Sequence, residues 1–186
     1  WQVPNFGLAD LKKQAGQIAA EFYAYPSTRL NMIGITGTNG KTSVSQWIAQ
    51  CLTSLGRKTA VLGTIGNGFV DAKNTALAEA SNTTPDAILL QGMLADYAEQ
   101  QADTVVMEVS SHGLDQGRVN GVAFDIAVLT NLSRDHLDYH VTMEAYAAAK
   151  QKLFEVRGLS MSVLNADDAF GLSVAELLKR QAKPCI

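Results

Sequence analysis

The chain has 186 residues and a mass of 19.9 kDa, which is enough for one good-sized hydrophobic core. Its net charge of −3 and pI near 5.6 argue against a basic surface for nucleic acid. No apolar run approaches the roughly 18 residues needed to span a bilayer, and the N-terminus lacks the pattern of a signal peptide. We therefore expect a cytoplasmic protein.

The chain contains two cysteines, Cys51 and Cys185, which are far apart in sequence. Cys51 falls on the apolar face of an expected helix, and Cys185 is next to the C-terminus. A buried cysteine and an incidental one in a reducing compartment explain this usage better than a disulfide.

Hydrophobic spacing predicts helices that alternate with strands. Helical spacing is found over residues 7–24, 41–55, 84–101, 142–155 and 168–180. Short apolar runs predict strands over residues 32–35, 58–64, 104–109, 125–130 and 161–164. Residues 65–81 are weakly patterned and are expected to form a loop with possible short strands. This alternation indicates an α/β fold with a mostly parallel sheet and helices on both faces.

Two of these helices have distinctive ends or faces. The helix from Lys41 is expected to bury one stripe and to end at Gly56 as its C-cap. The stripe consists of Val44, Trp47, Ile48, Cys51, Leu52 and Leu55. The helix that begins near residue 84 is expected to have Thr84 as its N-cap and Pro85 in its first turn.

A glycine-rich stretch, Gly34–Ser43, stands between the first expected strand and the helix that follows. That context is typical of a phosphate-binding loop, in which backbone N–H groups and a helix N-terminus face the anion. Lys41 would reach the terminal phosphates, and Thr42 would offer a hydroxyl to Mg²⁺. The general pattern also asks for a glycine at position 35, where this chain has Ile35. The alternative is a glycine-rich turn with an incidental lysine.

Polar residues also follow two later strands, at residues 108–113 and 130–140. Because the carboxyl ends of parallel strands lie at one edge of a sheet, these segments should converge on the glycine loop. Glu108 lies inside an apolar strand, where a carboxylate is costly unless it is paired or bound to a metal. It is expected to help hold Mg²⁺; the alternative is an ion pair with Arg118 or Arg134.

Two further readings of these segments are disfavoured. Ser110 and His112 could act as nucleophile and base, but no Gly-x-Ser-x-Gly elbow is present. The run Asp135-His136-x-Asp138-x-His140 suggests zinc, but no cysteine is near, and adjacent loop residues cannot all point at one ion. His136 is instead expected to serve a hard metal or a phosphate, or to form hydrogen bonds within its loop.

Lys150 shares the apolar side of its expected helix. At about 100° per residue it lies close to Tyr146 and Phe154, whereas Lys152 lies on the opposite side. A buried ammonium is disfavoured, so its pKa should fall and its neutral amine should become reactive. Alternatively, the stem packs and the charge reaches outward to solvent.

Several blocks together resemble the Mur ligase family, and within it the tripeptide synthetases. The matching stretches are residues 37–42, 82–85, 108–114, 116–119, 130–140 and 148–150. The resemblance covers roughly residues 30–170. It accounts for the missing first glycine, because the loop of this family is the shorter form. Small departures from its pattern are Ser43 and Val141.

The resemblance implies roles for individual residues. The ATP phosphates would be bound by Gly37, Thr38, Asn39, Gly40, Lys41, Thr42 and Ser43. Magnesium would be held by Thr42, Glu108 and His136, together with Lys150 as a carbamate (N6-carboxylysine). Lys41, His136 and Lys150 would be the catalytic residues. UDP-MurNAc-dipeptide would be bound by Asn82, Thr83, Thr84, Ser110, Gln116 and Arg118.

The implied activity is an ADP-forming ligation that adds the third amino acid to UDP-MurNAc-L-Ala-D-Glu through an acyl phosphate. The free amino acid would be the second substrate, and the protein would be a monomer. Residues 1–28 would be a linker or the end of an N-terminal region, and residues 29–186 an incomplete central ATP-binding domain. The amino acid, meso-diaminopimelate or L-lysine, would be selected by a C-terminal domain that is absent. Alternatives are a folylpolyglutamate synthase-like ligase, a non-ligase P-loop ATPase or a binding module.

Overall fold

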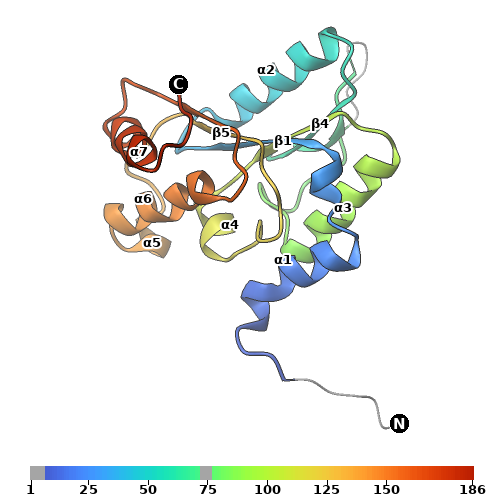
Figure 1. Ribbon diagram of the computed structural model, residues 1–186, viewed down its shortest axis with the longest axis horizontal. Coiled ribbons are helices and arrows are strands. Elements are labelled where there is room, and N and C mark those ends of the chain that lie inside the picture. Colours follow the sequence, from blue (N-terminus) through green and yellow to red (C-terminus); the bar gives the residue numbers. More distant parts are fainter. Residues whose placement is uncertain (1–6, 72–76) are drawn as a thin grey trace.

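The computed structural model of the chain describes residues 7–71 and 77–186. Its centre is a six-stranded sheet in the order β3-β2-β4-β1-β5-β6 (Figure 1). The strands are β1 (Asn31–Thr36), β2 (Thr59–Gly63), β3 (Gly66–Phe69), β4 (Thr104–Glu108), β5 (Ile126–Leu129) and β6 (Met161–Leu164). Neighbouring strands are parallel except for β2 and β3, which pair antiparallel. The predicted, mostly parallel α/β sheet is confirmed.

The helices connect these strands in the predicted alternation. They are α1 (Leu11–Phe22), η1 (Pro26–Arg29), α2 (Lys41–Ser54), α3 (Ala87–Glu99), α4 (Ser111–Asp115), α5 (Leu137–His140), α6 (Met143–Gln151), η2 (Lys152–Glu155) and α7 (Ala169–Arg180). The short helices α4 and α5 were not predicted, and both lie in the polar segments that follow strands. No helix in the described ranges is long and apolar enough to cross a bilayer.

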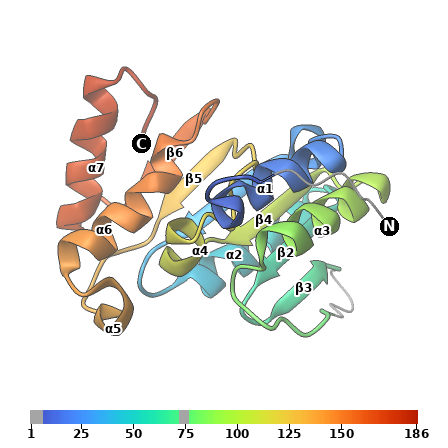
Figure 2. The same ribbon diagram turned by 90° about the horizontal axis from the view of Figure 1, so that it is seen from below.

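The two faces of the sheet carry different cores. On one face, side chains of α3, α4, η2 and α7 pack against Met32, Met107 and Leu129. On the other face, α2 packs against a smaller cluster that includes Ile35 and Val106. Figures 1 and 2 show α2 on one side of the sheet and α3, α4 and α6 on the other. Both faces are covered, as predicted.

Half of the predicted stripe of α2 is confirmed, because Val44, Ile48 and Leu52 pack against this second cluster, whereas the other half is wrong. The fully buried residues of the helix are Ser45 and Ala49, because small side chains let the helix approach the sheet closely. Trp47 is 65% exposed and Leu55 is 79% exposed. Cys51 is also exposed, so the prediction of a buried cysteine is wrong, and both thiols of the chain are free. The C-cap of the helix is Leu55 rather than the predicted Gly56, which follows it with φ of +81°.

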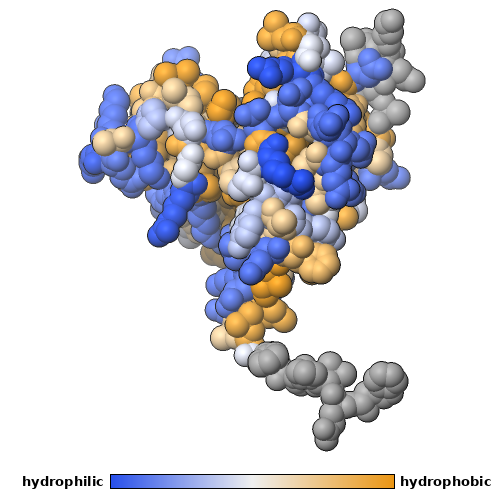
Figure 3. All heavy atoms as spheres, turned by 45° about the vertical axis from the view of Figure 1, so that its right-hand side comes forward, coloured by the Kyte–Doolittle hydropathy of each residue, from blue (hydrophilic) through white to orange (hydrophobic). Residues whose placement is uncertain are grey.

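Small residues also set the position of α1. Gly16, Ala19 and Ala20 form its buried side, and a side chain at Gly16 would collide with the backbone of Asn120. The apolar residues Leu8, Leu11, Ile18 and Phe22 are therefore left on the outside. Figure 3 shows apolar surface, in orange, over this helix in the lower part of the view.

The start of α3 also differs from the prediction. Asp86, not Thr84, is the N-cap, and its carboxylate accepts the N–H groups of Ile88 and Leu89. The hydroxyl of Thr84 is used elsewhere: it donates to the carbonyl of Glu108 (3.0 Å) and accepts the N–H of Ser110 (2.9 Å). Thr84 therefore ties the start of α3 to the end of β4.

Candidate active site

The glycine loop between β1 and α2 is held by the segment that follows β5. The N–H groups of Thr38 and Asn39 donate to the carbonyl and the side chain of Asn131, at 2.8 and 3.1 Å. The hydroxyl of Thr130 donates to the carbonyl of Asn39 (2.7 Å). The predicted convergence of these two strand ends is confirmed, and the contacts fix the shape of the loop.

This arrangement leaves the first turn of α2 open to an anion. The first N–H with an intrahelical partner is that of Val44, which donates to the carbonyl of Gly40 (2.9 Å). The N–H groups of Lys41, Thr42 and Ser43 therefore have no intrahelical acceptor, and they lie at the positive end of the helix dipole. These are the groups that a phosphate-binding loop supplies.

Two glycines are required by the geometry of the loop. Gly37 has φ of +145°, and a Cβ there would collide with the hydroxyl of Thr130. Gly40 has φ of +82° and directly precedes α2. A side chain at either position would strain the backbone, and at Gly37 it would also displace the neighbouring strand end.

Two lysines converge on this loop. Lys41 Nζ donates to the carbonyl oxygens of Gly37 (3.0 Å) and Thr38 (2.9 Å). Lys150 Nζ donates to the same Gly37 oxygen (2.8 Å) and lies 4.5 Å from the centroid of the Tyr146 ring. Lys150 is only 1% exposed, so its predicted burial is confirmed and the alternative of a charge reaching solvent is wrong.

Burial dominates the electrostatics of both lysines. It lowers the pKa of Lys41, whereas the charges of Glu108 and Asp135 act in the opposite direction. Burial, followed by the charge of Lys41, lowers the pKa of Lys150 to about 7. A large share of Lys150 is therefore neutral amine near pH 7, which is the nucleophilic form.

Glu108 is buried at the end of β4, with 1% exposure. Its carboxylate accepts hydrogen bonds from the Thr42 hydroxyl (2.9 Å) and from the N–H (2.9 Å) and hydroxyl (3.2 Å) of Thr64. Within residues 7–71 and 77–186 it forms no salt bridge, so the alternative of an ion pair with Arg118 or Arg134 is wrong. A buried carboxylate beside a threonine hydroxyl and a phosphate loop is a donor set that fits Mg²⁺.

All three histidines of the chain gather in one cluster near the loop. The ring of His112 lies 4.9 Å from that of His136 and 5.5 Å from that of His140. Burial lowers the pKa of His112, and the neighbouring His136 adds to this effect. Burial likewise lowers the pKa of His140.

This cluster bears on the predicted metal ligands. His136 lies against Asp135 Oδ2, 3.5 Å from its Nε2, and against the ring of Tyr146. Among the described residues, no three His, Cys, Asp or Glu side chains form a group that could hold a metal ion. The structure therefore joins Thr42 to Glu108 but does not bring His136 into the same group. The Ser110 hydroxyl accepts the N–H of Gly113 as the cap of α4, rather than pairing with His112.

The remaining candidate residues surround the start of α3. The Arg118 guanidinium donates to the carbonyl of Thr84 (2.9 Å) and to the side-chain oxygen of Gln116 (2.8 and 3.0 Å). Thr83 is joined to Thr64 through their hydroxyls (3.0 Å). Thr83, Thr84, Ser110, Gln116 and Arg118 thus belong to one hydrogen-bonded region, which Thr64 links to Glu108.

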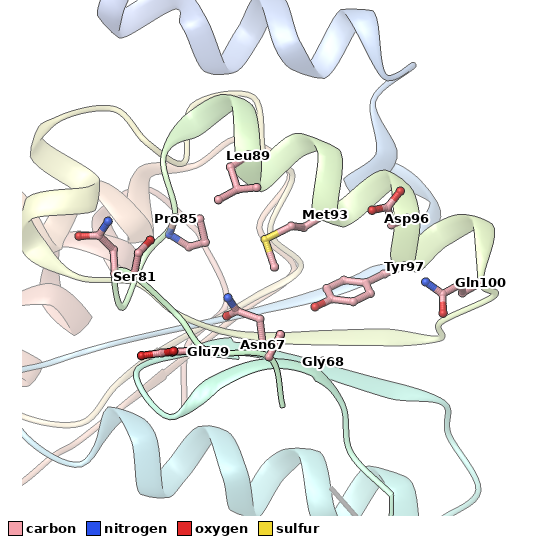
Figure 4. A pocket seen from close by; sticks show the side chains of 12 residues that line it. Asn67, Gly68, Glu79, Ser81, Pro85, Leu89, Met93, Asp96, Tyr97 and Gln100 are labelled. Carbon is pink, nitrogen blue, oxygen red and sulfur yellow. The ribbon is translucent and has the colours of Figure 1, made fainter. Parts of the chain in front are cut away.

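Two hollows meet at Asn82. One, of about 320 Å³, is shared by Asn82, Gln116 and Arg118. The other, of about 350 Å³, lies between α3 and β3 (Figure 4). In the second hollow, Met93 and Tyr97 of α3 point toward Asn67 of β3. Asn82 lines both hollows and is therefore accessible to a ligand in either.

Sequence reasoning assigned no role in the site to four residues that contribute to it. Thr130 and Asn131 support the glycine loop, and Thr64 binds Glu108. Tyr146 lies beneath Lys150 and shares a 3.2 Å hydrogen bond with Thr38. Only Tyr146 had a usable signal, because it precedes Lys150 by four residues and so lies on the same helix face.

Comparison with known proteins identifies the family. The profile described as "Mur ligase middle domain" matches residues 35–186. The 2,6-diaminopimelate ligases acting on UDP-N-acetylmuramoyl-L-alanyl-D-glutamate from Nitrosomonas europaea and Chromobacterium violaceum are 54% and 55% identical over 178 and 175 residues. These alignments cover 96% and 94% of this chain but 33% and 35% of the relatives. The chain thus spans about a third of their length.

Comparison with solved structures supports the same family assignment. A ligase of the same name, 40% identical, superposes with a TM-score of 0.81 over all of this chain and 37% of its own. The folylpolyglutamate synthase of Mycobacterium tuberculosis, bound to ADP and AMPPCP, is 18% identical, with a TM-score of 0.71 over 94% of this chain and 46% of its own. The latter likeness shows the fold alone. The matched domain, the phosphate loop and the extensive identity together establish that this chain belongs to the Mur ligase family.

Proposed function

We propose that the full-length protein is an ADP-forming ligase that adds an amino acid to UDP-N-acetylmuramoyl-L-alanyl-D-glutamate. The observation that carries the proposal is the pair of lysines, half-buried Lys41 and buried Lys150, on the carbonyl of Gly37 in the phosphate loop. The names of the relatives support 2,6-diaminopimelate as the amino acid. Residues 29–186 would be the central ATP-binding domain, and residues 1–28 a linker or the end of an N-terminal region. The enzyme would be monomeric and cytoplasmic.

The reaction would have two steps. The γ-phosphoryl group of ATP would pass to the glutamate carboxylate, giving an acyl phosphate and ADP. The amine of the incoming amino acid would then attack the acyl carbon, forming the amide bond and releasing phosphate and a proton. Lys41 and the N–H groups at the start of α2 would stabilise the negative charge of the phosphoryl group in transfer.

The residues around the loop also fit a magnesium-dependent reaction. Thr42 and Glu108 would hold one ion beside the phosphates, and His136 would serve a second position. Bound Mg²⁺ would supply charge neutralisation between the phosphate oxygens. The low pKa of Lys150 supports its reaction with CO2: the amine forms an N–C bond, loses a proton and becomes a carbamate. The resulting N6-carboxylysine would place two oxygens where an ammonium now lies.

The muramoyl substrate would bind where Asn82, Gln116 and Arg118 share a hollow. The planar fork of Arg118 suits a carboxylate, and its present acceptors are neutral oxygens that a carboxylate could replace. Thr83, Thr84 and Ser110 would extend the site toward Glu108. No nucleic-acid or membrane partner is proposed.

The decisive assay compares acceptors. ADP release by the full-length protein is measured with ATP, Mg²⁺ and diaminopimelate, using either UDP-MurNAc-L-Ala-D-Glu or a folate as the acceptor. We expect ADP and the UDP-linked tripeptide only with the muramoyl acceptor. Turnover with the folate would favour a folylpolyglutamate synthase-like activity. ATP hydrolysis at a rate that does not depend on either acceptor would favour a non-ligase P-loop ATPase. Replacing diaminopimelate by L-lysine tests the amino acid.

A further inference from the structure

The hollow that contains Asn82, Gln116 and Arg118 has a second wall, which comes from α1. Lys12 and Ala15 of this helix line it together with Asp86 and Ile88 from the start of α3. Figure 2 shows α1 and α3 side by side on one face of the sheet. Lys12 lies outside the region that matches the family domain, residues 35–186. The preceding helix therefore adds a cation to a site otherwise built by the domain.

The position of Lys12 is fixed by close backbone contacts of α1. Gly16 lies against Asn120 and Gly121, too close for a side chain at position 16. The Asn120 side chain also donates to the carbonyl of Lys13 (2.9 Å). Lys12 precedes Gly16 by four residues, so it lies on the same helix face, one turn away. The contact that seats the helix thus also holds Lys12 beside the hollow.

The charges around this hollow favour an anion. Arg118 is half-buried, yet all its acceptors are neutral oxygens, and in the described ranges it forms no salt bridge. In the same part of the chain, Lys12 has neither a hydrogen bond nor an ion pair. The carboxylate of Asp86 already accepts two N–H groups as the cap of α3. Two cations without an anionic partner therefore face one hollow.

We propose that Lys12 is a further substrate-binding residue, whose ammonium binds the diphosphate of the nucleotide-linked substrate while Arg118 binds a carboxylate. This inference rests on the proposed function. A compact ammonium suits phosphate oxygens, and a guanidinium fork suits a carboxylate. A substrate with anionic groups at both ends of its sugar and peptide portion matches a hollow with cations on two walls.

The test compares Lys12 with its neighbour Lys13 in the full-length protein. Lys13 lines a different hollow, with Asn120 and Lys152, and so is a matched control. The variants are Lys12→Ala, Lys12→Arg and Lys13→Ala. The measurements are kcat and KM for UDP-MurNAc-L-Ala-D-Glu at low and high salt, and its Kd by calorimetry without ATP. The same Kd is measured for UDP-MurNAc-L-Ala, which keeps the diphosphate but lacks the glutamate.

We expect Lys12→Ala to raise KM and both Kd values by up to about fivefold, the range of an exposed ion pair, with kcat nearly unchanged. Because salt screens the lost attraction, the difference from wild type should shrink at high ionic strength. Lys12→Arg should restore most of the affinity, and Lys13→Ala should match wild type. Equal Kd values for Lys12→Ala and Lys13→Ala would overturn the inference. A wild type that binds the substrate but makes no tripeptide would instead overturn the proposed function. The role of Lys12 would still be decided in that case, because the Kd comparison does not depend on turnover.

Discussion

Lys41 and Lys150 donate hydrogen bonds to one and the same oxygen, the carbonyl of Gly37. Two like charges on a single acceptor repel each other, and the charge of Lys41 contributes to the low pKa of Lys150. Replacing the Lys150 ammonium by an anion would turn this repulsion into attraction. The pair therefore makes modification of Lys150 electrostatically favourable in this position.

The first prediction concerns that modification. Lys150→Ala should lower the turnover of the full-length enzyme by about 100-fold, because it removes the amine that we propose becomes a carbamate and supplies oxygens to the metal site. Added acetate should restore part of the activity by placing carboxylate oxygens in the vacated space. Lys152→Ala is the control, since Lys152 is exposed and pairs with Asp115 at the surface. The carbamate assignment fails if acetate has no effect and both variants are equally impaired.

The second prediction concerns Lys41. Lys41→Ala should reduce kcat by about 100- to 1,000-fold, because the phosphoryl group loses a positioned positive charge. The fold should persist, since among residues 7–71 and 77–186 the hydrogen bonds of Lys41 Nζ go only to carbonyl oxygens of its own loop. Turnover and far-UV circular dichroism of the purified variant test both statements. Near-normal turnover in a folded variant would remove Lys41 from the mechanism.

The third prediction concerns pH and stability. The pKa of Lys150 is about 7 in the folded chain and 10.5 as the ordinary value, so between these limits the unfolded chain binds more protons. The free energy of unfolding should therefore rise with pH from about 7 to 10.5, by up to about 1.4 kcal/mol per pH unit from this group, and the gain is lost as pH falls to 7. Lys150→Met should flatten this slope. Urea unfolding in CO2-free buffer measures it, and identical slopes would contradict the expectation.

The fourth prediction compares two glycines with positive φ. Gly37→Ala should weaken ATP binding at least about tenfold and destabilise the chain by about 1–3 kcal/mol, because its Cβ meets Thr130. Gly56→Ala has open space around it, so backbone strain alone should cost about 1 kcal/mol and ATP binding should not change. Nucleotide titration measures the ATP affinity of both variants, and denaturant unfolding measures their free energy of unfolding. Unaltered nucleotide affinity in Gly37→Ala would show that the loop tolerates the displacement.

The sequence predicted what depends on local periodicity. The strands and longer helices follow from apolar spacing, and the burial of Lys150 follows from its position relative to Tyr146 and Phe154. The stripe of α2 was right for Val44, Ile48 and Leu52, which pack against the sheet, and wrong for Trp47 and Leu55, which are exposed. The fully buried positions are the small Ser45 and Ala49, which allow close approach. Hydrophobic spacing alone does not carry this information.

Long-range polar contacts were also beyond sequence reasoning. Thr84 has the right residue type for an N-cap, but its hydroxyl bonds to Glu108 and Ser110 of another strand end. Likewise, Thr130 and Asn131 support Asn39 across more than 90 residues of chain. These partners become visible only when the sheet places β4, β1 and β5 side by side. The convergence of the strand ends was therefore predictable, whereas the individual hydrogen bonds between them were not.

The clustering of His112, His136 and His140 has an experimental consequence. They are all the histidines of this chain, and their rings lie within one group near the phosphate loop. Selective isotope labelling of histidine would therefore give imidazole NMR signals from this region alone, without background from the rest of the domain. Shifts of these three resonances on adding nucleotide or Mg²⁺ would report occupancy of the site directly, independent of any turnover assay.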